Sequence, residues 1–227
     1  MKALKIALCA ATASLAFGSA AFAEDVSVTY NIGVASDYVF RGVSQTDEGV
    51  QLFGGADLSS GMFYAGVWAS NVDFLDSTDA EIDVYAGITP EAGPVKFDLA
   101  ALYYGYVNAP SGGDYDFWEF KAAAKVPAGP LTLGAAVFYS PEFFGGIGDA
   151  TYYEGNVSFS PADKWSVSAA LGEQTFDIGG DYSTWNLGVG YAFTDKVAAD
   201  LRYSATDIDG VDIADDRVAL SLKVTLP

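Results

Sequence analysis

Histidine is absent from this sequence of 227 residues, and cysteine occurs once, at Cys9. Without histidine the chain lacks the usual general base near neutral pH, and it also lacks a common ligand of zinc and copper. Hydrolase triads built on histidine are therefore excluded. We expect no enzyme activity, no catalytic residue, no cofactor and no metal site.

Basic residues are also scarce, because 11 lysines and arginines stand against 30 aspartates and glutamates, for a formal net charge of −19. Such an acidic surface repels phosphate groups, so nucleic acid is excluded as a partner. Long apolar runs are missing after residue 23, where no stretch approaches the roughly 18 apolar residues of a membrane-spanning helix. If this chain crosses a membrane, it does so with strands.

Residues 1–23 have the pattern of a secretory signal peptide. Two lysines precede an apolar stretch at 6–17, and 21–23 reads Ala-Phe-Ala, a cleavage site of the small-x-small kind. Removal of this segment takes Cys9 away, so we expect neither a disulfide nor thiol chemistry in residues 24–227. The length of that remainder suits a single β-domain.

Short and long polar connections alternate along the rest of the chain. The short turns are expected at 59–61, 90–94, 127–130, 161–164 and 194–196, and the long loops at 38–49, 73–79, 107–115, 140–150, 173–183 and 206–216. A barrel that crosses a bilayer has this alternation of connection lengths, because short periplasmic turns join its strands at one rim and long extracellular loops join them at the other. A soluble β-sandwich has no reason to keep every second connection tight.

Between these connections lie twelve segments in which apolar and polar residues alternate, which is typical of strands with one apolar face. The segments are 26–35, 50–58, 62–72, 80–88, 95–103, 118–125, 131–137, 152–159, 165–172, 184–193, 197–204 and 217–226. The second and third lack a clear alternation, because Phe53 and either Tyr64 or Trp68 break it. In the other ten, no charged residue falls on the apolar face.

The apolar faces are expected to form an outer wall against lipid, since a charge at the middle of a bilayer costs about 2–4 kcal/mol. Val84, Leu99 and Leu220 represent this wall. Aromatic residues gather near the segment ends, as in the girdles of membrane barrels. Those near short turns are Phe159, Trp165 and Phe193, and those toward the long loops are Tyr38, Phe40, Tyr103, Tyr106, Trp118, Tyr139, Tyr153, Trp185 and Tyr203.

Residues 36–47 read SDYVFRGVSQTD and, together with the segments 59–74 and 83–87, they resemble the TorF-type porin family. The specific motifs lie in roughly the first third of the chain. The remainder resembles the family only in its alternation of short turns and long loops. The resemblance implies an outer-membrane β-barrel of the proteobacterial type and brings no catalytic residues with it. The last residue is Pro227, where such barrels usually carry an aromatic residue.

Charged residues on the polar faces are the candidates for lining a lumen and selecting what passes through it. They are Glu81, Asp83, Asp98, Glu119, Lys121, Glu154, Asp200 and Arg202, with Lys96, Arg217 and Lys223 on the same faces and Arg41 added from the first long loop. Two interpretations stay open. Facing rows of opposite charge could form a constriction with a transverse field, or pairs such as Glu119 with Lys121 could neutralise one another.

Two loops also have two interpretations each. Arg41 could turn inward as a selectivity element, or it could fasten its own loop through an ion pair with Asp37, Asp47 or Glu48. The acidic segment 206–216 resembles a calcium loop only loosely and lacks the EF-hand spacing. It either binds divalent ions that bridge to lipopolysaccharide or is a solvated loop.

The pattern as a whole predicts an all-β protein with a single antiparallel, up-and-down transmembrane β-barrel at 24–227, located in the cell outer membrane. The first hypothesis for its function is passive diffusion of small hydrophilic solutes or ions, with a preference for cations because acidic loops attract them. The second is a closed structural or adhesive barrel that binds an external partner through its loops. A third is a soluble periplasmic β-protein. Lipid and lipopolysaccharide are the expected surroundings, and the sequence leaves monomer and trimer equally open.

Overall fold

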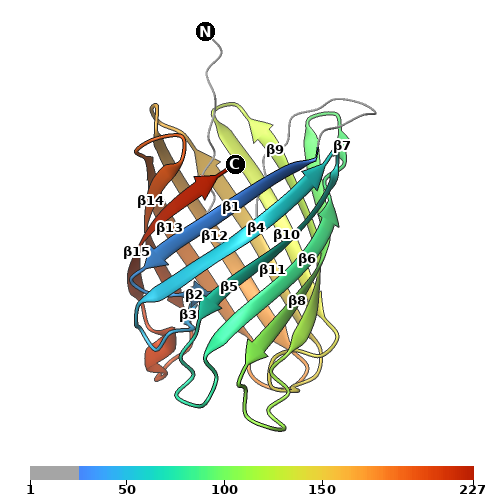
Figure 1. Ribbon diagram of the computed structural model, residues 1–227, viewed down its shortest axis with the longest axis vertical. Helices are drawn as coiled ribbons and strands as arrows, with labels where there is room; N and C mark the ends of the chain where they lie inside the picture. Colours follow the sequence, from blue (N-terminus) through green and yellow to red (C-terminus); the bar gives the residue numbers. More distant parts are fainter. Residues whose placement is uncertain (1–25) are drawn as a thin grey trace.

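The computed structural model describes residues 26–227, which form a closed antiparallel barrel of twelve long strands (Figure 1). The strands are β1 (Ser27–Ala35), β4 (Gln51–Ser60), β5 (Phe63–Asn71), β6 (Ala80–Ile88), β8 (Val95–Val107), β9 (Phe117–Ala128), β10 (Leu131–Ser140), β11 (Ala150–Phe159), β12 (Trp165–Phe176), β13 (Tyr182–Ala192), β14 (Val197–Thr206) and β15 (Arg217–Leu226). Neighbours in the chain pair with each other, and β1 pairs with β15 to close the ring. The predicted fold class is confirmed.

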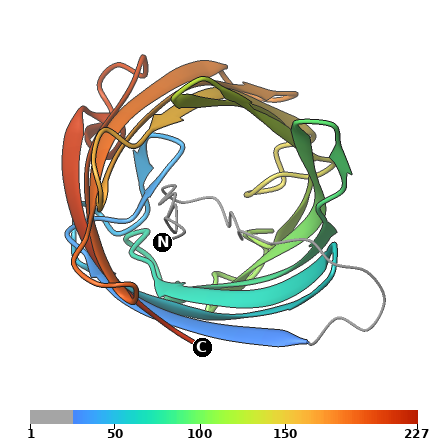
Figure 2. The same ribbon diagram turned by 90° about the horizontal axis from the view of Figure 1, so that it is seen from above.

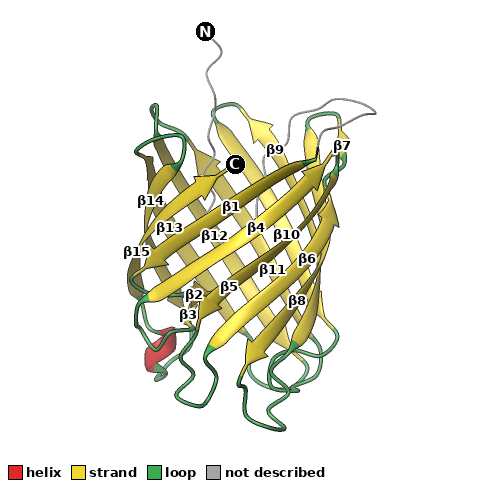
Figure 3. Ribbon diagram, viewed as in Figure 1, coloured by secondary structure: helices red, strands yellow, loops and turns green. Residues whose placement is uncertain are grey.

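The connections alternate between a short-turn rim and a long-loop rim (Figure 3). Both described ends of the chain lie at the short-turn rim, while the segment between β1 and β4 lies at the other (Figure 1). The predicted signal peptide at 1–23 falls outside the described residues. Within the described part of the chain, no helix combines the length and the apolar character needed to cross a bilayer.

Several elements differ from the predicted segments. The first long loop contains a small hairpin of β2 (Val39–Phe40) and β3 (Val43–Ser44), and a short β7 (Glu91–Ala92) pairs with the start of β8. A 3₁₀ turn, η1 (Asp212–Ala214), lies in the last long loop. The strands β8, β9 and β12 extend beyond the predicted segments, because backbone pairing continues past the point where the apolar alternation ends.

The apolar faces lie on the outside of the barrel, as predicted. Val84, Leu99 and Leu220 are 49%, 44% and 55% exposed, which large apolar residues in a central core would not be. Aromatic side chains are exposed near both rims: Phe159, Trp165 and Phe193 near the short turns, and Trp118, Tyr139, Tyr153, Trp185 and Tyr203 near the long loops. The exterior is therefore an apolar band with aromatic borders, the surface expected against lipid.

Three aromatic residues were wrongly predicted to join these borders. Tyr38 and Phe40 belong to the hairpin of the first long loop, where Tyr38 contacts Trp68 and Phe40 contacts Tyr104. Tyr106 lies on the same strand face as the buried Tyr104. Proximity to a strand end could not distinguish these positions, because the side of the wall depends on strand parity and on the path of the loop.

The irregular second and third segments owe their appearance to lumen-facing aromatic residues. Tyr64 is buried on the inner face of β5, and Trp68 lies four residues further along the same face. Phe53 of β4 also lies on the inner face, over the backbone of Gly33. Because these apolar rings face the lumen, polar and apolar residues no longer alternate along the two strands. The side chains themselves still alternate between the inside and the outside of the barrel.

Inward-facing glycines make room for large neighbouring side chains to lie flat against the wall. Gly66 of β5 pairs with Tyr85 of β6, and a β-carbon at Gly66 would lie 2.5 Å from the tyrosine ring. Gly188 of β13 likewise lies beneath Arg202 of β14. Large polar groups therefore line the lumen along the wall instead of pointing across it.

We predict that Leu220→Arg destabilises the barrel in lipid vesicles by about 2–4 kcal/mol, because it places a charge near the middle of the apolar band. Ser221→Arg is the control, because Ser221 faces the lumen opposite Asp200. Urea unfolding in vesicles measures both variants. Equal destabilisation by the two substitutions would contradict the assignment of the outer and inner faces.

Candidate functional site

A hairpin formed by residues 38–45 folds from the long-loop rim into the barrel (Figure 2). Val39 pairs with Ser44 and Phe40 with Val43, so the turn consists of Arg41 and Gly42. Both turn residues have positive φ angles, 47° and 87°, as two-residue turns in hairpins require. We call these residues the lumen hairpin.

Arg41 at the tip of the lumen hairpin binds the inner wall through its guanidinium group. Nη1 and Nη2 donate to the two carboxylate oxygens of Glu119 on β9 at 2.8 and 2.9 Å, and Nη1 also donates to Gln174 Oε1 on β12 at 2.8 Å. The guanidinium carbon lies 4.3 Å from the ring centre of Tyr152 on β11 and 5.1 Å from that of Phe138 on β10. A planar, forked donor suits this combination of a bidentate carboxylate and aromatic faces.

This contact joins the lumen hairpin to strands that are distant from it in the ring. The lumen hairpin connects β1 to β4, and in the ring of twelve strands β10 and β11 lie farthest from these two. The side chain of Arg41 is 6% exposed, and that of Glu119 is 1% exposed. These low exposures show that protein atoms surround the Arg41–Glu119 ion pair.

The base of the lumen hairpin is fastened to the near wall. The Tyr38 hydroxyl donates to Glu81 on β6 at 2.6 Å. Asp37 accepts a hydrogen bond from Arg217 of β15 at 2.9 Å and another from Ser44 at 2.6 Å. At the tip, a β-carbon on Gly42 would lie 2.6 Å from the Thr184 hydroxyl of β13, so the turn also touches the wall beside β12.

Two ion pairs line the half of the lumen nearer the short turns. Lys121 of β9 bonds Asp98 of β8 at 2.5 Å, and Asp98 also accepts from the Tyr64 hydroxyl at 2.6 Å. Arg202 bonds Asp200 of the same strand at 3.1 Å. It further donates to Asn186 of β13 and Ser168 of β12, at 2.5 and 2.9 Å. These pairs stay on the wall and hold no loop.

A group of lumen-facing carboxylates lacks a cation. Among the ion pairs of residues 26–227, none includes Asp57, Glu81 or Asp83, which lie on the inner faces of β4 and β6. Asp57 accepts from the Tyr85 hydroxyl, while one carboxylate oxygen of Asp83 is buried without a hydrogen-bond partner in the described structure. This arc of the wall therefore holds three carboxyl groups without a cationic partner among the described residues.

Arg41 and the eight charged residues first named from the strand faces all lie at the lumen. Of the three others, Lys96 pairs with Glu91, Arg217 pairs with Asp37, and Lys223 has no carboxylate partner within residues 26–227. Arg41 meets Glu119, Lys121 meets Asp98, and Arg202 meets Asp200, whereas Glu81, Asp83 and Glu154 have no cationic partner within residues 26–227. Arg41 does not fasten its own loop through Asp37, Asp47 or Glu48. Asp37 and Glu48 instead lie near Arg217, at 2.9 and 3.6 Å.

Several important residues were missed by the sequence reasoning. Gln174 was placed in a loop, although β12 extends to include it. Asp57 was hidden in the segment whose alternation Phe53 disturbs, but strand parity alone would have assigned it to the lumen. No sequence signal could have linked Arg41 to Glu119, because these residues are 78 positions apart.

The long loops carry an aromatic cluster that lies at the mouth of the barrel. Phe74, Tyr106, Tyr115 and Phe144 contact one another with ring centres 4.3 to 6.1 Å apart. Beside them lies an open pocket of about 690 Å³. Its lining combines the two tyrosine rings with acidic and amide side chains: Asn108, Asp114, Asp116 and Glu142.

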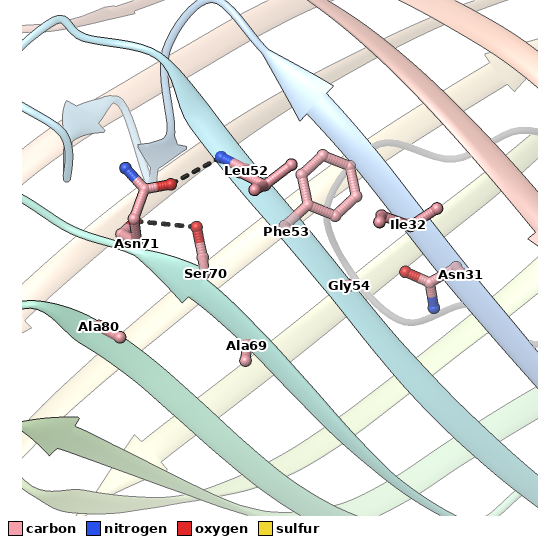
Figure 4. Close-up of a pocket in the computed structure, with 9 residues that line it drawn as sticks. All are labelled: Asn31, Ile32, Leu52, Phe53, Gly54, Ala69, Ser70, Asn71 and Ala80. Carbon is pink, nitrogen blue, oxygen red and sulfur yellow. Dashed lines mark hydrogen bonds between the residues drawn. The ribbon is translucent and has the colours of Figure 1, made fainter.

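A second, smaller groove of about 350 Å³ lies in the wall of β1, β4, β5 and β6 (Figure 4). Its lining is mostly apolar and includes outward residues such as Ile32 and Leu52. At its edge Asn71 accepts from the backbone N–H of Leu52 at 2.6 Å and donates to the carbonyl of Val50 at 3.0 Å. The asparagine therefore completes the hydrogen bonding where the β4–β5 ladder ends.

The acidic last loop is tied to the barrel by its own carboxylates. Asp207 accepts from the backbone N–H of Ser183 at 2.7 Å and from its hydroxyl at 3.0 Å, and Asp216 accepts from Tyr203 at 2.6 Å. Within residues 26–227, no group of three or more histidine, cysteine, aspartate or glutamate residues is arranged to hold a metal ion.

Comparison with known families places this chain in a group defined by its sequence. A model described as "Bacterial protein of unknown function (Gcw_chp)" matches residues 19–224. The chain belongs to the Gcw_chp family. No curated protein matches the sequence.

Solved structures with a similar fold include bacterial porins. The KdgM porin has a TM-score of 0.62 at 8% identity, with 88% of this chain and 98% of that chain covered. The KdgM porin in complex with disordered oligogalacturonate has a TM-score of 0.61 at 6% identity, and the NanC porin has 0.54 at 11%, both with the same coverage. At these identities the similarity shows the barrel fold shared with porins.

We predict that the pKa of Asp207 lies below its usual range, because Ser183 donates two hydrogen bonds to the ionised carboxylate, first through its backbone N–H and then through its hydroxyl. The stabilisation is complete above the pKa of the unfolded chain and is lost as the pH falls through the lowered, folded-state pKa. NMR titration of the carboxyl carbon measures the pKa directly. Ser183→Ala should raise it partway toward the usual value, and an unchanged pKa in this variant would contradict the role of the hydroxyl.

Proposed function

We propose that this protein is an outer-membrane channel for the passive passage of small hydrophilic solutes, with a preference for cations. The observation that carries the proposal is the distribution of side chains across the wall. Large apolar residues are exposed on the outside, while ion pairs and carboxylates line the inside. This is the inverse of a soluble β-sandwich, whose apolar faces meet in a core. It therefore disfavours the soluble periplasmic alternative.

Two kinds of similarity support the same function. The fold is shared with the KdgM and NanC porins, although at 8% and 11% identity. The segment 36–47 resembles the TorF-type porin family, and we propose that the chain is related to it. The signal-peptide pattern at 1–23 agrees with export to the outer membrane.

The charge of the lumen supports the preference for cations. Arg41, Lys121, Arg202 and Arg217 are each paired with a carboxylate, so they offer little net positive charge to a passing anion. Asp57, Glu81 and Asp83 form the arc of unpaired carboxyl groups described above, and the acidic loops add negative charge at the mouth. Fixed charges of one sign raise the local concentration of counter-ions and set selectivity.

The neighbour bound to oligogalacturonate suggests a contrast in substrate. That ligand is a polyanion, and its passage is favoured by unpaired cations. In the lumen described here, carboxylates without a cationic partner gather on β4 and β6. Four cations are paired (Arg41, Lys121, Arg202 and Arg217), and the two lumen lysines without a carboxylate partner among the described residues, Lys125 and Lys223, lie on other strands. We therefore propose that neutral and cationic solutes pass more readily than acidic oligosaccharides.

Planar-bilayer recordings in a salt gradient test this function. We expect single-channel conductance with a reversal potential that indicates cation preference. Asp57→Asn should move the reversal potential toward that of a non-selective channel, because it removes a lumen-facing carboxylate that has no cationic partner among residues 26–227. Asp195→Asn, in the turn between β13 and β14, is the matched control. Anion preference of the folded wild-type protein would reject the proposal.

A closed structural or adhesive barrel is the second candidate. Dense packing around the lumen hairpin favours it, because a filled lumen would not conduct. The aromatic cluster and its pocket at the long loops favour it as well, because they offer a surface to an external partner. Conductance separates the two functions. Folded protein that never conducts, but that loses partner binding when loop 108–116 is shortened, would support the adhesive barrel.

A further inference from the structure

We propose that Arg41 determines the width of the permeation path by holding the lumen hairpin across the barrel, so that it acts as a size-selecting positioning residue. This inference rests on the proposed channel function. It assigns a role to one contact, the attachment of the hairpin tip to β9 and β12, which lie on the far side of the ring from β4.

The arrangement of contacts distinguishes Arg41 from the rest of the lumen hairpin. Tyr38 and Asp37 attach the base to β6 and β15, which are close to β1 and β4 in the ring. The tip reaches β9 to β12 through Arg41, whose guanidinium supplies three hydrogen bonds and contacts the rings of Phe138 and Tyr152. Without Arg41, the base remains attached while the tip loses its charged contact with the far wall.

The hairpin itself has little internal structure to keep its tip in place. Its ladder consists of two residue pairs, and short two-stranded hairpins are only marginally stable alone in water. The tip is therefore positioned by what it binds. Because the lumen is polar, water can replace the lost hydrogen bonds and the hairpin can move toward the near wall.

Passage through a channel of this width is controlled by its narrowest section. A twelve-stranded barrel has a lumen between those of filled eight-stranded barrels and open sixteen-stranded porins. A hairpin that enters this lumen and contacts β9 and β12 therefore reduces the path to the space that remains beside it. Release of the tip should widen the path and admit larger solutes.

The test compares two matched pairs of substitutions. Arg41→Ala with Glu119→Gln releases the hairpin and leaves no unpaired charge. Arg202→Ala with Asp200→Asn is the control, because it removes an equivalent lumen ion pair that holds only wall strands. We expect the first pair to raise single-channel conductance by about twofold or more and to admit larger neutral sugars in a vesicle-swelling assay. The control should change both readouts much less.

A reversible crosslink provides the second measurement. Gly42→Cys and Thr184→Cys, added to the release variant, join the hairpin tip to β13, because a β-carbon at Gly42 would lie 2.6 Å from the Thr184 hydroxyl oxygen. Thr206→Ser accompanies them, since that β-carbon would lie 2.4 Å from the Thr206 methyl group. The φ of 87° at Gly42 strains a cysteine there, so folding of the reduced variant is verified first. With the predicted signal peptide removed, no native cysteine competes for this disulfide. The oxidised protein should have the low conductance of the wild type, and dithiothreitol should restore the high conductance.

The outcomes separate this inference from the proposed function. Equal conductance and equal size limits in the release and control variants would overturn the role of Arg41 while leaving the channel function intact. Identical conductance of the oxidised and reduced crosslinked proteins would also overturn it. If no folded variant conducts, including the release variant, then the channel function itself fails and the inference fails with it.

Discussion

The constraint on which this structure depends is that a chain crossing a bilayer must satisfy every backbone hydrogen bond within itself. The twelve long strands meet it by closing into a ring, with β1 paired to β15. Closure removes both sheet edges and creates an inside and an outside. Strand parity then assigns each side chain to one or the other. The lipid-facing wall, the polar lumen and the separation of the two rims all follow from this closure.

Ion pairs neutralise all the lumen arginines, while one arc of the wall holds carboxyl groups without cations. Each arginine of the lumen pairs with a carboxylate, whereas Asp57, Glu81 and Asp83 lack a cation among the described residues. Tyrosine hydroxyls bond two of these carboxylates. A paired cation contributes local structure with little net field, while unpaired carboxylates contribute a field. The same wall therefore holds a loop in place at Arg41 and leaves carboxylates without cations on β4 and β6, which is the feature behind the proposed preference for cations.

Most of the fold was predictable from the sequence because the relevant physics is local. Alternating residues such as those of 217–226 reveal a two-faced strand, and tight turns alternate with long loops along the chain. The outward positions of Val84 and Leu99 follow from strand parity alone.

The lumen hairpin was not predictable in this way. Its position depends on the hydrogen bonds between Arg41 and Glu119 of β9. The sequence of a loop does not specify which distant residue the loop will contact. Gln174 was missed for a related reason, since strand pairing extended β12 beyond its apolar pattern.

Brominated-lipid quenching of tryptophan fluorescence tests the central claim most directly, because the four tryptophans lie on different sides of the wall. Trp118, Trp165 and Trp185 are exposed on the outside, whereas Trp68 contacts Tyr38 of the lumen hairpin. Variants that each keep one tryptophan, reconstituted in vesicles, allow the four to be compared. The account predicts strong quenching of the three outer tryptophans and weak quenching of Trp68. Equal quenching of all four, or quenching of none, would contradict a lipid-facing exterior around a polar lumen.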